Sequence, residues 1–177
     1  MRRFIFLAVL CLMGPMVAKA QDAAANPLSA TLRESFDQYS KDLVAAAEIM
    51  PADKYSYHPK AEEMTFGKTI EHVSEVNNFA CAKVSDMPAP TGPKAVEADG
   101  KDKLVAGLKA SMEYCSQAFS KLTDAKLTET VTIFGGRKTT RLGAAMEVVD
   151  DLIDHYAALA VYLRLNGLLP PTAQKKP

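Results

Sequence analysis

The chain lacks several features that mark out large classes of protein. Its 177 residues carry 21 basic and 21 acidic side chains, so there is no excess of positive charge. Because a nucleic-acid-binding domain needs a basic face, this balance excludes a nucleic acid as the expected partner. The sequence also has no internal repeat and no low-complexity tract. Its length suits one domain with a proper hydrophobic core.

Long hydrophobic runs are missing as well. The most apolar stretch, residues 4–13, is too short for an ordinary membrane span. Basic residues precede it, and the small-residue cleavage pattern Ala18, Lys19, Ala20 follows it, so residues 1–20 are predicted to be a secretory signal peptide. A retained N-terminal anchor is the alternative. We expect the mature protein to be exported, either periplasmic or secreted, without stable insertion in a membrane.

Removal of this segment would take away three basic side chains, Arg2, Arg3 and Lys19, and no acidic one. The mature chain would then carry 18 basic and 21 acidic side chains, a mildly acidic balance. This composition gives no reason for the protein to meet DNA.

Cysteine is scarce, and only Cys81 and Cys115 remain in the predicted mature chain. An exported compartment permits a disulfide between them. Each also lies on an apolar helical stripe, so two separate buried thiols are an equal alternative. The sequence cannot supply the Cα separation that would decide between the two. A catalytic thiol is disfavoured, because neither cysteine has a histidine near it in the sequence.

Four segments do show a clear pattern, with apolar residues at every third or fourth position. This spacing predicts four amphipathic helices, and together they predict a four-helix bundle. The predicted helices run from the cap Ser29 to Pro51, from the cap Thr65 to about Asp86, over residues 101–122, and from the cap Thr140 to about Asn166. Pro-rich residues 87–99 form a long linker, which allows an arrangement other than simple up-down-up-down.

The last predicted helix is the most apolar of the four, and we expect it to be central. Its stripe at spacings of three and four consists of Leu142, Met146, Val149, Ile153, Ala157, Ala160 and Leu163. Further apolar residues, among them Val148 and Leu152, widen this stripe. Gly167 is expected to end the helix, and Pro170 and Pro171 to prevent its restart.

Residues 127–140 change character, because β-branched residues alternate there with polar ones. Gly135 and Gly136 are typical of a two-residue hairpin turn, so we predict a short β-hairpin that leans on the helices. The expected fold class is therefore all-α, a four-helix bundle with a short β-hairpin before the last helix. We expect a flexible segment over 21–27, the bundle over 28–171 and a disordered tail over 172–177.

The candidate site lies on two of these helices. Asp151 and His155 are four residues apart, so their side chains share one helical face. The only other histidine on a predicted helix is His72, since His58 falls in a loop. Two imidazoles and one carboxylate can bind a divalent first-row metal and leave positions open for substrate. The alternative is a surface Asp–His pair and an unrelated His72 that bonds a carbonyl.

Three segments resemble the DinB-like (DinB/YfiT) superfamily of metalloenzymes. The segment from Thr65 through Gly67 and His72 to Asn77 is similar to the second helix of that family. The segment from His155 through Tyr162, Arg164 and Gly167 to Pro170 and Pro171 is similar to its fourth helix and exit. The extended stretch around Gly135 and Gly136 also fits. The resemblance spans nearly the whole predicted mature chain.

This resemblance implies a bundle that holds a divalent metal through one histidine of the second helix and an H-x-x-x-H pair of the fourth. His72 and His155 match two of these ligands, whereas Asp151 stands where the family has the first histidine of the pair. Because aspartate can ligate Zn, Ni, Mn or Fe, we expect a variant site of two histidines and one carboxylate. Loss of the metal is the alternative. Ala157 and Ala158 stand where the family often has Gly-Gln.

The resemblance also bears on activity, since known members include thiol-dependent transferases and isomerases. Members that use low-molecular-weight thiols work in the cytoplasm, so predicted export argues against such a cosubstrate here. We expect metal-assisted hydrolysis or group transfer on a small molecule, with Asp154 or Glu75 as hydrogen-bond partner of a ligating imidazole. The bundle is also compatible with a homodimer.

The alternative function is a metal-free helical module that binds a small apolar ligand or a partner protein. A di-iron bundle is disfavoured, because the chain lacks the paired Glu-x-x-His motifs that such sites require.

Overall fold

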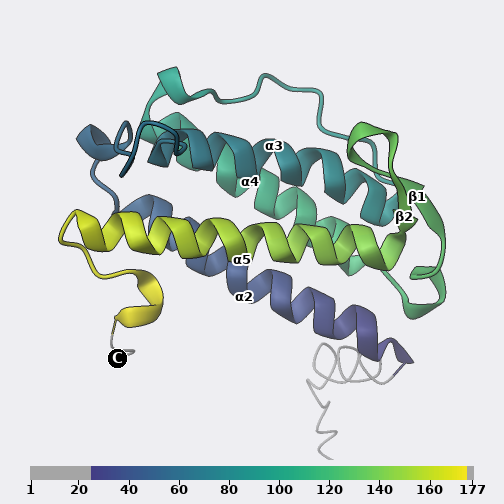
Figure 1. The fold of residues 1–177 in the computed structure, drawn as a ribbon. Helices are drawn as coiled ribbons and strands as arrows, with labels where there is room; N and C mark the ends of the chain where they lie inside the picture. Colours follow the sequence, from purple (N-terminus) through teal and green to yellow (C-terminus); the bar gives the residue numbers. More distant parts are fainter. Residues whose placement is uncertain (1–24, 175–177) are drawn as a thin grey trace, which may run out of the picture.

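The computed structural model describes residues 25–174 (Figure 1). The predicted signal peptide, 1–20, and most of the predicted flexible segment, 21–27, lie outside these described residues. None of the helices in the described part of the chain is long and apolar enough to span a membrane.

Four long helices dominate the structure, as the apolar spacing predicts. They are α2 (Pro27–Ile49), α3 (Phe66–Ser85), α4 (Lys101–Ser120) and α5 (Arg141–Leu165). A two-stranded antiparallel hairpin, β1 (Thr130–Thr132) and β2 (Lys138–Thr140), precedes α5. Single turns of 3-10 helix complete the fold at Ala52–Lys54, Glu97–Asp99, Asp124–Lys126, Phe134–Gly136 and Pro171–Ala173.

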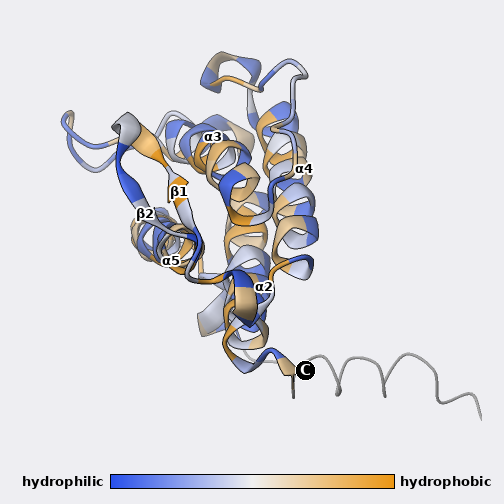
Figure 2. Ribbon diagram, turned by 90° about the vertical axis from the view of Figure 1, so that its right-hand side faces the viewer, coloured by the Kyte–Doolittle hydropathy of each residue, from blue (hydrophilic) through white to orange (hydrophobic). Residues whose placement is uncertain are grey.

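The helices form a bundle in which α2 and α3 each pack against both α4 and α5 (Figures 1 and 2). Linker residues 87–99 return along the outside of the bundle, since Lys94 pairs with Glu75 and Glu97 N–H donates to Glu71. As a result, α3 and α4 run in the same direction, and α5 runs opposite to them (Figure 1). This confirms that the long linker gives a bundle other than simple up-down-up-down.

The core is apolar and closely packed between the helices. Phe36 of α2 stacks on Phe119 of α4 with 4.8 Å between ring centroids, and both are buried. Burial of one such side chain contributes about 1.5–3 kcal/mol to folding, so a few of these contacts outweigh any single polar contact at the surface.

Two predicted helix caps are confirmed. The hydroxyl of Thr65 accepts a hydrogen bond from Lys68 N–H at 3.0 Å, and that of Thr140 accepts one from Gly143 N–H at 3.1 Å. Each cap satisfies one of the backbone donors that the first turn of a helix leaves unpaired. The predicted end at Gly167 is also confirmed, since this glycine has a φ of 75° and Leu168 N–H donates to the carbonyl of Leu163.

The predicted cap Ser29 is wrong, because α2 begins at Pro27 with Asn26 in the cap position, and Ser29 is buried. Proline suits the first helical position, where no N–H is needed. The carboxylate of Asp124, far along the chain, accepts hydrogen bonds from Leu28 N–H and Ser29 N–H at 3.2 and 2.8 Å. The Asp124 carboxylate therefore caps the first turn of α2 in place of a local side chain.

The hairpin is confirmed, but its two-residue turn is not. Thr132 pairs with Lys138, and Ile133 N–H donates to the carbonyl of Arg137, so the loop consists of the three residues 134–136. Both glycines have a positive φ, 64° and 77°, a conformation that other residues adopt only with strain. The two glycines therefore make the turn possible, and the extra residue, Phe134, lies at its tip.

The predicted core stripe of α5 is wrong in part, because Met146 and Ile153 are 47% and 37% exposed and Ala157 is exposed as well. The buried side of the helix consists chiefly of Ala145, Val148, Leu152, Tyr156, Leu159 and Leu163. Apolar residues occur on most sides of this helix, so spacing alone permits more than one stripe.

The end of the chain also differs from the predicted tail over 172–177. Residues Pro171–Ala173 form a turn of 3-10 helix, and Thr172 N–H donates to the hydroxyl of Tyr156 at 3.1 Å. Residues 175–177 lie outside the described part of the chain.

The two cysteines left open by the sequence form a disulfide. Cys81 of α3 and Cys115 of α4 are bonded, their Cα atoms are 5.2 Å apart and both residues are fully buried. The bond fixes the two parallel helices to each other in the middle of the core.

A buried arginine joins three segments at the hairpin end of the bundle. Arg141, the first residue of α5, is only 4% exposed. Its guanidinium donates to both carboxylate oxygens of Asp86 and to the carboxylate of Glu129, and it also donates to the carbonyl of Lys83. The end of α3, the segment before β1 and the start of α5 are therefore held at one point.

We expect Arg141→Met to lower the free energy of unfolding by about 2–3 kcal/mol, because charge-assisted hydrogen bonds are lost from a buried position. Urea unfolding followed by circular dichroism measures this. The matched control is Arg137→Met, which removes an exposed arginine that pairs with Glu147 and should cost about 0.5 kcal/mol or less. Equal losses in the two variants would contradict a clamping role for Arg141.

The double variant Cys81→Ala/Cys115→Ala should lose about 3 kcal/mol of stability, because the disulfide restricts the unfolded chain over a separation of 34 residues. Chemical unfolding of oxidised protein and of the variant gives the difference. Thiol labelling of the unfolded, unreduced protein should detect no free thiol at these two positions, and labelling of both would overturn the prediction.

Candidate metal centre

The structure brings the three predicted ligands together between α3 and α5. Asp151 Oδ1 lies 3.4 Å from His155 Nε2 and 4.0 Å from His72 Nε2. The two imidazole rings are 5.0 Å apart between centroids and nearly perpendicular, at 77°. One donor atom from each of the three residues lies within 4.8 Å of the others. The antiparallel contact of α3 with α5 thus places His72 opposite the Asp151–His155 pair.

The three side chains differ in their exposure to solvent. The side chain of His155 is 11% exposed, that of Asp151 is 21% exposed and that of His72 is 39% exposed. One carboxylate oxygen, Asp151 Oδ2, is buried and accepts no hydrogen bond from any described residue. A buried oxygen without a donor is costly, and a cation would compensate it.

The residues present fit a divalent metal. Ligand atoms at about 2.0–2.1 Å from a tetrahedral ion lie about 3.3 Å from one another. The distance between Asp151 Oδ1 and His155 Nε2 already matches this spacing, whereas the more exposed His72 must move closer to both of them. Two nitrogens and one oxygen suit Zn, Ni, Mn or Fe.

The charge state of His155 depends on its neighbour. A hydrogen bond to Asp151 raises the pKa of His155 above its ordinary value, burial opposes this, and the charges of Asp151 and Asp154 add to the increase. Without a metal, the contact with Asp151 therefore favours the protonated form of His155. A metal ion must displace that proton, since only the neutral imidazole ligates.

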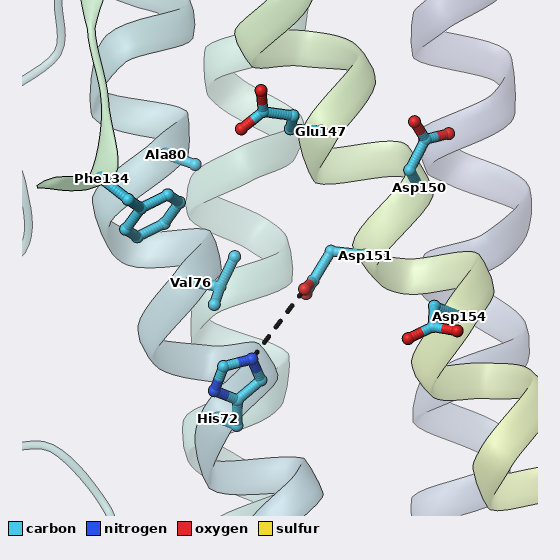
Figure 3. A pocket seen from close by; sticks show the side chains of 8 residues that line it. All are labelled: His72, Val76, Ala80, Phe134, Glu147, Asp150, Asp151 and Asp154. Carbon is cyan, nitrogen blue, oxygen red and sulfur yellow. Dashed lines mark ion pairs between the residues drawn. The ribbon is translucent and has the colours of Figure 1, made fainter. Parts of the chain in front are cut away.

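A pocket of about 490 Å³ opens beside these ligands (Figure 3). His72 and Asp151 line it, whereas His155 does not. Its other lining residues are Val76, Ala80, Phe134, Glu147, Asp150 and Asp154. In Figure 3 the apolar side chains stand on the side of α3 and the hairpin, and the carboxylates stand on α5.

Sequence reasoning missed Phe134 and Glu147 as pocket residues. The hairpin was predicted, but nothing local indicates that its tip lies over α3. There Phe134 packs on Phe79, with ring centroids 4.5 Å apart. Glu147 belongs to the same face of α5 as Asp151, four residues later, and this spacing is the signal that could have found it.

Of the two residues predicted as hydrogen-bond partners of a ligating imidazole, only Asp154 lies at the pocket. Glu75 pairs with Lys94 at 3.5 Å and does not line the pocket, so it is wrong as a partner. Asp154 lines the pocket and acts on the pKa of His155 through its charge. His58 lies in the loop as predicted, where its Nδ1 is 2.6 Å from the carbonyl of Lys60.

Comparisons with known proteins agree with this architecture. Residues 35–159 match the family model described as the DinB superfamily. None of the curated proteins matches this sequence.

Several solved structures are similar to the chain, among them the following three. A DinB-like protein from Bacillus subtilis has a TM-score of 0.66 at 21% identity, over 82% of this chain and 99% of that one. A conserved protein from Enterococcus faecalis has a TM-score of 0.57 at 12% identity, over 76% and 94%. A mutant of a mycothiol-dependent maleylpyruvate isomerase has a TM-score of 0.59 at 12% identity, over 74% and 60%. At these identities the likeness shows the fold alone.

In metal-free protein, the pKa of His155 should lie above the ordinary histidine value of about 6.5, and Asp151→Asn should lower it by removing the carboxylate. Histidine ring signals followed by NMR across a pH series measure both values. Asp150→Asn is the matched control, since this carboxylate lies one residue away and is not among the causes of the shift. An unchanged midpoint in Asp151→Asn would contradict the observed pairing.

Proposed function

The chain belongs to the DinB superfamily, and we propose that it binds a divalent metal through His72, Asp151 and His155. We also propose that it is an exported protein. Its activity would be hydrolysis or group transfer on a small molecule. The observation that supports this most strongly is the convergence of three donor atoms, from two helices, within 4.8 Å. The pocket beside them offers space for a substrate.

Export is supported by two independent features. Residues 1–20 have the pattern of a signal peptide. The buried disulfide between Cys81 and Cys115 fits an oxidising compartment, because cytosolic thiols are usually kept reduced. The same disulfide removes both thiols of the described chain from the set of available metal ligands.

When bound, a divalent ion would supply a Lewis acid and would lower the pKa of coordinated water. Asp151 contributes the negative charge of the ligand set, and its unpaired oxygen gives it a reason to accept a cation. His155 is held in the core and has little freedom, whereas His72 faces the pocket. A substrate in the pocket would therefore meet His72 and Asp151 first.

The apolar side of the pocket has its own part in this function. Val76 and Ala80 of α3 and Phe134 of the hairpin exclude water from one side of the space. They would bind the unreactive part of a substrate and orient it toward the ligands.

A metal-free binding module is the second candidate. The direct contact of 3.4 Å between His155 Nε2 and Asp151 Oδ1 favours it, because the pair gives the imidazole a partner without a metal. The apolar wall of the pocket would then be the main source of affinity for a ligand.

Metal content of the purified mature protein after exhaustive dialysis tests the proposal. We expect close to one metal ion per chain in the natural protein, and a loss of affinity of about 100-fold or more in Asp151→Ala and in His155→Ala, because each removes a ligand. Elemental analysis and zinc titration calorimetry supply the two readouts. A thermal shift on zinc addition should accompany binding.

Asp150→Ala is the matched control, since it removes a neighbouring carboxylate that is not in the ligand set. It should keep its metal and its far-ultraviolet circular dichroism. If the natural protein fails to bind Zn, Ni, Mn and Fe even after loading, the metal proposal fails and the module remains.

A further inference from the structure

We propose that the pocket beside the three ligands selects a small organic cation, a molecule with an amine, guanidine or quaternary ammonium group on a short apolar body. The inference deepens the proposed function and rests on it only for the reacting end of the substrate. It is carried by the two unlike sides of the pocket (Figure 3).

The volume and the apolar side of the pocket indicate the size and the apolar character of the ligand. A space of about 490 Å³ holds a small molecule and no folded partner. Phe134 lines the pocket and is 43% exposed even though its ring packs on Phe79, so part of this aromatic residue is accessible to a ligand. Lys83 already lies over the Phe79 ring, 5.5 Å from its centroid. An available aromatic face attracts both apolar groups and cations.

The acidic side of the pocket, on α5, indicates that the ligand carries a positive charge. Four carboxylates of α5 line the pocket, and no lysine or arginine does so. Arg137 neutralises Glu147, and Asp151 belongs to the ligand set. Asp150 and Asp154 make no ion pair with any residue between 25 and 174, so two carboxylates without an ion-pair partner border the space.

The spacing of these acids is unfavourable for the helix itself. Glu147 and Asp151, like Asp150 and Asp154, are four residues apart, and like charges at this distance repel one another on a helix. A bound cation relieves this repulsion. A divalent metal held by Asp151 would leave the charges of Asp150 and Asp154 in place.

Three probes of similar shape and different charge test the inference: phenethylammonium, 2-phenylethanol and phenylacetate. We expect the ammonium to bind the whole metal-free protein about tenfold more tightly than the alcohol at low salt, and phenylacetate to bind most weakly. The preference should shrink as salt is added. Calorimetry or NMR titration gives the dissociation constants.

The metal-free protein decides the question, because a carboxylate probe could itself ligate a metal. Metal content is measured separately on the natural protein, so a failure of the metal proposal and a failure of the charge preference give different results.

Substitutions in the pocket test which residues cause the preference for the ammonium. D150N/D154N should bring the affinities for the ammonium and the alcohol to within about twofold of each other, because the two carboxylates without an ion-pair partner are gone. E62Q/E63Q removes the same charge from an exposed loop and should keep the preference. F134A should weaken all three probes by a similar factor.

Three results would overturn the inference. Phenylacetate could bind as tightly as phenethylammonium, the preference could survive in D150N/D154N, or F134A could leave the affinity for phenethylammonium unchanged. The last result would mean that the probe binds elsewhere.

Discussion

The buried guanidinium of Arg141 is the contact on which the pocket depends. It ties Asp86, at the end of α3, to Glu129, before β1, and to its own place at the start of α5. Two short strands alone are marginally stable in water, so the hairpin needs this anchor to keep its position over α3. Phe134, at the tip of this hairpin, supplies part of the apolar wall of the pocket. The same guanidinium joins the end of α3 to the start of α5, the two helices that set His72 opposite Asp151.

A second constraint acts on α3 from its other side. The disulfide joins Cys81 to α4, while Arg141 joins the end of α3 to α5. The long linker makes α3 and α4 parallel, so the two helices have no short connection to hold them in register (Figure 1). The disulfide in the core holds α3 and α4 together in place of a short connecting loop. The ligands thus stand on helices held in place, and only Phe134 comes from a loop, which is how functional sites are often built.

The features that sequence predicted are those with local signals. Thr65 and Thr140 cap helices through a neighbour three residues away, and the spacing of Asp151 and His155 places both on one face. The features that it missed depend on distant residues. The start of α2 depends on Asp124, almost a hundred residues later, and the site of Phe134 depends on how the hairpin folds over α3. The buried side of α5 could not be chosen from spacing, because apolar residues lie around most of that helix.

The aspartate at position 151 changes the electrostatics of the whole site. The resemblance to the superfamily implies three neutral histidines, which would leave a divalent ion with its full charge. In the proposed site one ligand would be an anion, so the charge of a bound ion would be reduced and the ion would attract anionic molecules more weakly. The same carboxylate favours the protonated form of His155 when no metal is present, so protons compete with the metal for this site. Asp150 and Asp154 then act in the same direction as Asp151, and a pocket that would attract anions in a three-histidine site instead favours cations.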